Sequence, residues 1–402
     1  MTNRKKYIAI ITSAIAAAIL IAWIASRWSV WFHTPDEPSY TIGTGANDIQ
    51  LSLSRDRDTL HLSWRSSALY PQAATTWVDI DDNDTSTYHA TNRRIISDGG
   101  KAIFYNATIP VKPGKQYKYW ISSSANACTS DTFHTHTASA DSIRILIVGD
   151  IQDKRYTGTD SLIRSIAEHH NPNYIITLGD LIERPHQQYW DRYFTDFDSI
   201  ATSIPAAMTL GNHDYHKGID KYPDIRSFFT FPHLLPNKAN TDTATLYATR
   251  KHSLIGLSSI DFHTAKALFI DTNQPLKRLR LQRRQLADII VDHHGSPLFV
   301  MMHHAPHSAI SPLNNLIIKW FYHPILDNEK VKIVYAAHEH TLCHLTPQQT
   351  NAHYHQIIQH FSAKDYSSKG LEGRHYTILT VTPTSWTSTT YNLNHTPVII
   401  VE

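Results

Sequence analysis

The chain has 402 residues, of which 41% are hydrophobic and 18% are charged, so it can fold around more than one core and is not a disordered chain. Lysine plus arginine total 37 against 35 for aspartate plus glutamate, and the formal charge of +2 gives no electrostatic footprint for nucleic acid. Only two cysteines occur, Cys128 and Cys343, which excludes a disulfide-rich scaffold or a thiolate zinc site but leaves their mutual pairing open.

The first predicted element is an uncharged apolar segment, residues 7–26, that follows the basic sequence RKK. As a helix it is long enough to cross roughly 30 Å of hydrocarbon. Its positive flank should keep residues 1–6 in the cytoplasm and place the remainder outside. The alternative is a cleaved signal peptide, but the apolar run exceeds the usual length of about 7–15 residues and no clear small-residue cleavage site closes it. We predict a single-pass signal-anchor with the following domains periplasmic or extracellular.

Residues 27–44 form a polar tether with prolines, and the pattern then changes to short alternating runs over residues 45–138. Examples are TLHLSW at 59–64 and YKYWI at 117–121, in which apolar side chains point to one face. No long amphipathic helix interrupts these runs. The pattern predicts an antiparallel all-β sandwich of about a hundred residues, of the immunoglobulin-like or fibronectin III-like kind.

Residues 142–402 predict an α/β domain with layered β-sheets flanked by helices. Two β-rich runs, 144–148 and 174–178, enclose the segment TDSLIRSIAEHH at 159–170, whose apolar residues have helical spacing. Together they predict a βαβ unit. The other predicted elements are a helix at 275–294 and strands at 206–210, 265–271, 297–302, 331–337, 375–381 and 385–393.

Side chains able to bind metal follow five of the predicted strands, in a chain that contains 27 histidines. They are Asp150 with Gln152, Asp180, Asn212 with His213 and Asp214, His303 with His304, and His338 with His340. Ligand sites in open α/β sheets lie at the carboxyl ends of the strands, so these groups can converge. A buried carboxylate is costly unless it is paired or bound to a cation. So many donors indicate two ions about 3.5–4 Å apart, an arrangement suited to displacement at phosphorus.

The same residues resemble the calcineurin-like metallophosphoesterases. The resemblance rests on GD at 149–150 and 179–180, GNHD at 211–214, the pair His303-His304 and AHEH at 337–340, in the family's order. It implies that Asp180 bridges two metal ions, either divalent or trivalent, whose identity among Fe, Zn and Mn the ligands do not select. The ligands implied for the first ion are Asp150, Gln152 and His340, and those for the second are Asn212, His303 and His338.

Catalytic roles are implied by the resemblance as well. A hydroxide bridging the two ions would be the nucleophile, His213 would stabilise the phosphoryl oxygens or protonate the leaving oxygen, and Asp214 would orient the His213 ring. His303 is preferred over His304 as the ligand, and Gln152 is either a ligand or a hydrogen-bonding group.

The β-sandwich ahead of these blocks also resembles the layout of purple acid phosphatases. That subfamily has an iron-binding tyrosine three residues after the second aspartate, where this chain has Glu183. A tyrosinate–iron pairing is therefore not expected here, and Glu183 is read as a solvated loop residue or an acid near the ligands. His186, Tyr215, His216 and His307 are candidates to line the substrate cleft, with substrate choice set by loops at 217–242 and 311–323.

These observations favour a membrane-anchored hydrolase of small phosphate monoesters, without a nucleic-acid partner. A nucleotide or lipid-headgroup phosphodiesterase is the alternative within the same class. An alternative of another class is a surface binding module in which the metal is only structural.

Overall fold

The computed structural model describes residues 3–32, 42–54, 58–97, 100–123, 130–139, 141–152, 159–184, 187–214, 256–262, 264–361 and 373–402. The chain divides into two compact units, Met1–Ser39 and Tyr40–Glu402. Cys128, His186, Tyr215, His216 and the loop 217–242 lie outside the described residues, whereas Cys343 has a free thiol.

The first unit contains helix α1 (Asn3–Phe32), which is longer at both ends than the apolar segment predicted from the sequence. Within it, Lys6–Ala25 is long and apolar enough to cross a membrane. Side chains such as Ile15 and Trp23 are exposed. A signal sequence can pass the same test of length and composition, so the anchor and its orientation stay predictions.

The second unit begins with a β-rich domain built from two sheets. One contains β1 (Asn47–Leu53), β2 (Thr59–Ser66), β6 (Gly100–Pro110) and β5 (Thr91–Ser97), in that order; the other contains β4 (Thr85–His89), β3 (Ala73–Asp79), β7 (Gln116–Ser123) and β8 (Phe133–His136). Aromatic pairs fill the shared core: Trp64 stacks on Tyr105 at 5.4 Å and Trp77 on Tyr119 at 4.3 Å between ring centroids. The predicted sandwich therefore has an aromatic core, as expected from its alternating strands.

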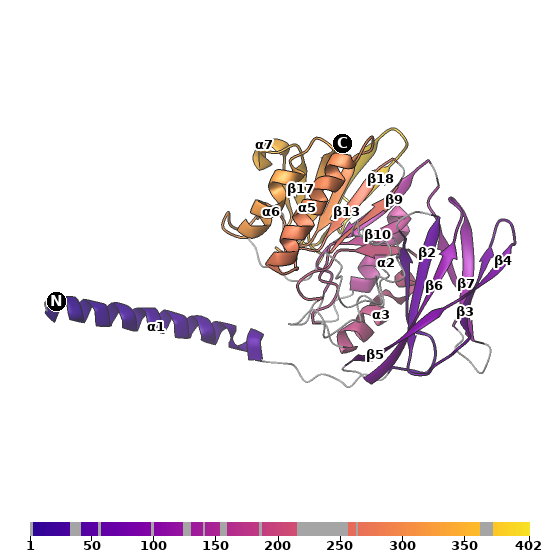
Figure 1. The fold of residues 1–402 in the computed structure, drawn as a ribbon, viewed down its shortest axis with the longest axis horizontal. Helices are drawn as coiled ribbons and strands as arrows, with labels where there is room; N and C mark the ends of the chain where they lie inside the picture. Colours follow the sequence, from indigo (N-terminus) through magenta and orange to yellow (C-terminus); the bar gives the residue numbers. More distant parts are fainter. Residues whose placement is uncertain are drawn as a thin grey trace. The chain divides into compact units, whose positions relative to one another are not determined.

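The β-rich domain is joined to the following domain through backbone and side chains. β1 pairs in parallel with β11 (Ala206–Met208) through Ser52 and Ala206, so one sheet of the sandwich continues into a ten-stranded sheet (Figure 1). The hydroxyl of Tyr119 donates to the carbonyl of Thr202 at 2.5 Å, and that of Thr135 donates to Ser203 at 2.7 Å. The two predicted domains thus share a sheet instead of meeting only through a linker.

The α/β domain starts with the predicted βαβ unit. β9 (Ile143–Val148) and β10 (Tyr174–Thr177) pair in parallel, and α2 (Thr159–His170) connects them. Ile145 and Ile147 pack into the core between the sheets, whereas Leu146 and Val148 pack toward the helices, as the two-residue period of a strand requires. Helix α3 (Gln187–Ala201) covers the same helical side and precedes β11.

The remaining elements complete a layered α/β arrangement (Figure 1). β18 (His375–Val381), β19 (Trp386–Asn392) and β20 (Pro397–Val401) extend the first sheet from β9. A six-stranded sheet has the order β12 (Leu257–Asp261), β13 (Lys266–Ile270), β14 (Leu298–Met302), β15 (Val331–Ala336), β17 (His355–Ile358) and β16 (Cys343–Leu345). Helices α5 (Leu276–Asp292) and α6 (Leu316–Leu326) cover its outer face, and α7 (Pro347–Thr350) is a single short turn. The predicted α/β layers are confirmed.

Candidate metal centre

The predicted ligands lie where parallel strands of the two sheets end. Asp150 follows β9, Asp180 follows β10 and Asn212 follows β11, while His303 and His338 follow β14 and β15 of the second sheet. Backbone hydrogen bonds hold these ends together: Asp150 donates to the carbonyl of Gly179 at 3.1 Å, and Ala337 donates to that of His303 at 3.0 Å. We call this group of strand ends, with the residues that follow them, the ligand edge.

The backbone at the ligand edge is strained at four predicted ligands. Asp150, Asp180, His338 and His340 have φ values of 52°, 55°, 71° and 48°, in the left-handed region that residues with a Cβ seldom occupy. Each costs on the order of 1–2 kcal/mol relative to an ordinary conformation. Strain of this kind persists only where the surrounding structure enforces it, and it is concentrated at functional sites.

Two glycines at the ligand edge make room for Asp180. A Cβ on Gly211 would lie 2.0 Å from the Asp180 Oδ1 atom, and one on Gly179 would lie 2.4 Å from the backbone nitrogen of Gly211. Gly179 also has a φ of 90°, which strongly favours glycine. The glycines of GD and GNHD are thus required by close approach of the two strand ends.

The ligands predicted for the second ion converge directly. The Asn212 Oδ1 atom lies 3.0 Å from Nε2 of His303 and 2.9 Å from Nδ1 of His338. Nε2 of His303 also lies 3.4 Å from Oδ2 of Asp180. Asn212 is exposed while His303 is fully buried, so the cluster is open to solvent on the Asn212 side.

The ligands predicted for the first ion are less closely gathered. Ligand atoms of Asp150, Asp180 and His303 all lie within 4.8 Å of one another. The Gln152 amide, oriented with its nitrogen toward Asp180, donates to the Asp180 carbonyl at 3.0 Å and to Oδ2 at 3.1 Å. His340 is outside this close group, and its ring centroid lies 6.3 Å from that of His360.

His303 and His304 both lie in the cluster, but in different environments. His303 directs Nδ1 to the carbonyl of Leu178 at 2.8 Å, which leaves Nε2 facing Asp180 and Asn212. His304 instead places Nδ1 2.7 Å from the hydroxyl of Thr272, and its ring lies 4.2 Å from that of His338. Ligand atoms of His303, His304 and His338 also lie within 4.8 Å of one another, so His304 can take part.

The structure corrects the expected role of Asp214. Its carboxylate accepts hydrogen bonds from the backbone N–H groups of Asp180, Leu181 and Gly211, at 2.9, 2.9 and 2.8 Å. The His213 ring is held by another group, because its Nδ1 lies 2.7 Å from the Glu183 carbonyl. Asp214 therefore fixes the ligand edge, and the carbonyl of Glu183 orients the imidazole.

Of the two alternatives for Glu183, the solvated loop residue is wrong, since the residue is only 4% exposed. The other, an acid near the ligands, agrees with its carbonyl lying 2.7 Å from Nδ1 of His213. The prediction from the sequence did not include His360. This histidine is buried beside His340 and follows β17, just as each predicted ligand follows a strand. Glu339, in the middle of AHEH, is buried as well and accepts from the backbone N–H of Ala309 at 2.6 Å.

Electrostatic coupling at the ligand edge is strong. Burial alone would raise the pKa of Asp180, but the charge and hydrogen bond of His303 lower it well below its ordinary range. Burial alone would lower the pKa of His303, but Asp180 raises it to about 9. Burial, followed by the neighbouring charge of Asp180, raises the pKa of Asp214 to about 7. The buried Asp180 carboxylate thus has His303 as its cationic partner.

The donor set fits divalent or trivalent metal ions. Carboxylate, imidazole and amide donors approach one another closely and without a thiolate, which suits Zn, Mn and Fe. His213 lies beside the same donors, because its backbone N–H donates to Oδ1 of Asp180 at 2.8 Å.

Comparison with known proteins gives a consistent result. Residues 143–342 match the family model of calcineurin-like phosphoesterases. An uncharacterised metallophosphoesterase of Campylobacter jejuni is 24% identical over 144 residues, which cover 33% of this chain and 38% of that protein. The aligned part therefore spans well under half the length of this relative.

Solved structures are similar at the level of the fold. A purple acid phosphatase from yellow lupin seeds aligns with 89% of this chain and 74% of its own, with a TM-score of 0.68 and 12% identity. A dimetal phosphatase from Danio rerio aligns with 64% of this chain and 98% of its own, with 12% identity and a TM-score of 0.42 that is too low to support an argument.

Proposed function

The α/β domain of this chain belongs to the calcineurin-like phosphoesterases, and from this premise we propose that the protein is a two-metal hydrolase of phosphate monoesters. The observation that carries the proposal is the contact of Asn212 Oδ1 with both His303 and His338 beside Asp180. Amide, imidazole and carboxylate donors meet there at one solvent-accessible point. A purely structural site has no need of an open side.

The residues can be assigned by position. Asp180, Asn212, His303 and His338 would hold one ion, and Asp150, Gln152 and His340 would hold the other together with Asp180. Bound ions would neutralise the phosphoryl charge and supply an activated water for attack at phosphorus. The strained backbone at Asp150, Asp180, His338 and His340 would keep the donors fixed before substrate arrives.

His213 would act on the substrate from beside the ligands. A hydrogen bond from Nδ1–H to the Glu183 carbonyl leaves Nε2 as the nitrogen that can carry a proton to the leaving oxygen or donate to a phosphoryl oxygen. Asp214 would serve as a positioning residue, since its three backbone contacts fix the chain around Asp180 and Gly211.

Monoester preference is supported by the arrangement of domains. The alignment with a purple acid phosphatase covers 89% of this chain, which includes residues of the β-rich domain as well as the α/β domain. The pairing of the eight strands as β1-β2-β6-β5 and β4-β3-β7-β8 fits a fibronectin III-like sandwich. A diesterase active on nucleotides or lipid headgroups is the second candidate, because Asn212 is exposed beside the other donors.

The test is turnover of an aryl monophosphate and a bis-aryl phosphate by the full chain in detergent, with Mn, Zn or Fe supplied after chelation. We expect metal-dependent hydrolysis with faster turnover of the monoester. Faster turnover of the diester would establish the second candidate instead. A metal-binding protein inactive on both esters with every metal would favour the surface binding module.

The helix α1 would anchor this enzyme in the membrane, with residues 1–6 cytoplasmic and the α/β domain outside. Protease added to cells whose outer membrane, where one is present, has been removed should then degrade the α/β domain and leave an N-terminal fragment in the inner membrane. A soluble mature protein that begins after residue 26 would show that the segment is a cleaved signal peptide.

A further inference from the structure

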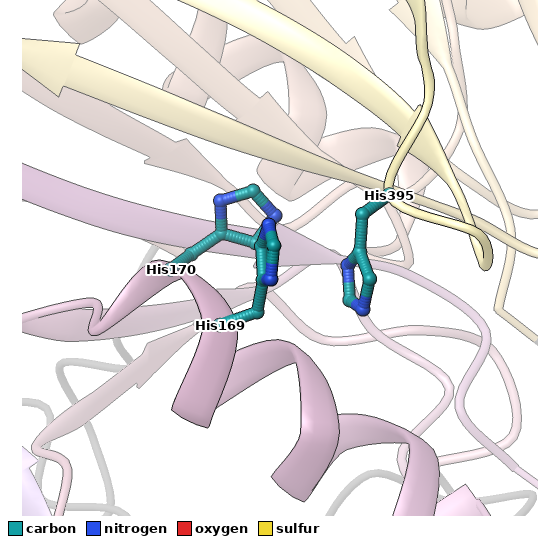
Figure 2. Close-up of side chains that lie close together, drawn as sticks. All are labelled: His169, His170 and His395. Atoms are coloured by element: carbon teal, nitrogen blue, oxygen red, sulfur yellow. The ribbon is translucent and has the colours of Figure 1, made fainter.

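A second group of histidines lies on the α/β domain between the end of α2 and the turn that joins β19 to β20 (Figure 2). His169 and His170 occupy the last turn of α2, and His395 lies in the turn. The three rings each offer one nitrogen, and these three nitrogens all lie within 4.8 Å of one another. None of the three is among the ligands proposed for phosphate-ester hydrolysis. We call them the three-histidine cluster.

Hydrogen bonds fix the turn that carries His395. This residue has a φ of 56°, and its backbone N–H donates to the carbonyl of Asn392 at 3.1 Å. The Asn392 side chain accepts from the backbone N–H groups of Asn394 and Thr396, at 3.0 and 3.1 Å. The turn is therefore held by several hydrogen bonds, and the left-handed residue at its tip directs an imidazole toward α2.

Tyr376 of β18 holds the rings of His170 and His395 in place through its hydroxyl. Its hydroxyl oxygen lies 2.8 Å from Nε2 of His170 and 2.6 Å from Nδ1 of His395. With an ion bound, this oxygen would accept the N–H of both rings, which leaves the lone pair on the opposite nitrogen of each ring for the ion. A hydrogen-bond partner of this kind orients imidazoles in metal sites and sets which nitrogen carries the proton. His169 completes the group, with its ring stacked on that of His395 at a centroid distance of 4.1 Å.

The ring of His170 can offer a lone pair to a cation. Burial, and then the neighbouring His169 and His395, lower the pKa of His170 to about 4, so its ring is neutral near pH 7. Arg144 lowers this pKa too, and its positive charge would oppose a bound cation. The C-terminal end of α2 carries the negative end of the helix dipole, which favours a positive ion beside the last turn.

We propose that His169, His170 and His395 bind a divalent cation of the zinc class and thereby clamp the β19–β20 turn to α2. Three neutral imidazoles with water in a fourth position are an established ligand set for Zn²⁺. Among the residues that the structure describes, no thiolate belongs to the cluster, which disfavours Cu(I). β20 is the last strand of the ten-stranded sheet, so the clamp would fasten an edge that pairs with β19 on one side only.

The alternative is that the rings only stack and hydrogen bond. Stacking explains the contact of His169 with His395, and Tyr376 explains the orientation of the other two rings. If the rings only stack and hydrogen bond, micromolar metal should neither bind to the cluster nor stabilise the protein. If the cluster is a clamp, the metal should bind tightly and stabilise the fold. The two cases are therefore separable by titration.

The experiment uses the full chain with a tag that contains no histidine, stripped of metal and then loaded with Zn²⁺. The test variants are His169→Gln, whose side chain is exposed, and His395→Asn, since asparagine tolerates the left-handed conformation. The control is His344→Gln, because His344 forms a pair with His355 at 3.0 Å and belongs to no group of three metal-binding side chains among the described residues.

After equilibration at about 10 μM free Zn²⁺, the wild type and His344→Gln should each contain one more Zn²⁺ per chain than either test variant. Zn²⁺ should also raise the melting temperature less in the test variants. An anomalous scattering peak at the zinc edge should lie between the three rings. Wild-type zinc content in both test variants, or an equal loss in His344→Gln, would overturn the clamp. Neither outcome depends on phosphate-ester hydrolysis.

Discussion

The β-sandwich of residues 47–136 buries aromatic rings, whereas the ligand edge of the α/β domain buries carboxylates and imidazoles. In the sandwich, Trp64 and Trp77 stack against tyrosines, and burial of these rings stabilises the fold. At the ligand edge, Asp150 and Asp180 are equally buried but have left-handed backbones, and both features cost stability. Packing therefore stabilises the sandwich, whereas the ligand edge retains buried charge and backbone strain at a cost in stability.

The largest effect is expected where the two proposed ions share a ligand. Asp180→Asn removes the carboxylate that faces His303 and Gln152, and should lower the metal content of both sites. Turnover of an aryl monophosphate should fall by about a thousandfold or more. Elemental analysis and initial rates check this, and retention of two ions with normal turnover would contradict the bridging role.

A single methyl group should have almost as large an effect at the ligand edge. Gly211→Ala would place a Cβ 2.0 Å from Oδ1 of Asp180, so the strand end must move and the donors must separate. We expect metal affinity and kcat both to fall, with kcat lower by on the order of a hundredfold. The matched control is Gly45→Ala ahead of the sandwich, where a Cβ meets nothing within 4 Å. Similar kinetics for the two variants would remove the steric argument.

His213→Gln separates chemistry from metal binding. The variant should retain its metal, because His213 is not a ligand in the proposed assignment, and should lose about a hundredfold in kcat. The loss should be smaller for a substrate with a better leaving group, since such a group needs less protonation. Loss of metal together with activity would indicate that His213 has a ligand or structural role instead.

The smallest effect is expected in the sandwich and concerns stability alone. Burial lowers the pKa of His61 to about 4, against roughly 6.5 in an unfolded chain. Above pH 6.5 both states are neutral, and as the pH falls from 6.5 toward 4 the unfolded state binds the proton more tightly. His61 therefore lowers the free energy of unfolding by roughly 2 kcal/mol at pH 5 relative to pH 7.

Urea unfolding at pH 7 and pH 5 gives the free energy of unfolding at each pH, and comparing the variants with the wild type gives the contribution of His61. His61→Gln should lose less stability on acidification than the wild type, while His134→Gln, an exposed position of β8, should behave like the wild type. Per folded molecule, neither variant should alter turnover at pH 7. Equal acid sensitivity in all three proteins would show that the buried His61 does not contribute.

Helix α6 and the pairing of β1 with β11 were not predicted from the sequence, because the local sequence patterns there are ambiguous. Helix α6 has the sequence LIIKWFYHPIL, which is apolar on most sides and contains Pro324, so neither helical spacing nor an uninterrupted run marked it. β1 looked like an ordinary sandwich strand, and nothing in its residues indicated a parallel pairing with β11 from a distant part of the chain. Both features depend on partners remote in the sequence.

The α/β layers, the aromatic sandwich and the strand ends that bear Asp150, Asp180, Asn212, His303 and His338 could all be predicted from the sequence. The period of a strand and the Gly-Asp pairs that end it are local signals, and parallel strands end at a common edge. The folded structure was needed to show that the carbonyl of Glu183 holds His213, that Asp214 binds backbone N–H groups, and that His395 meets α2. These contacts join residues with no fixed sequence spacing, so only the folded chain specifies them.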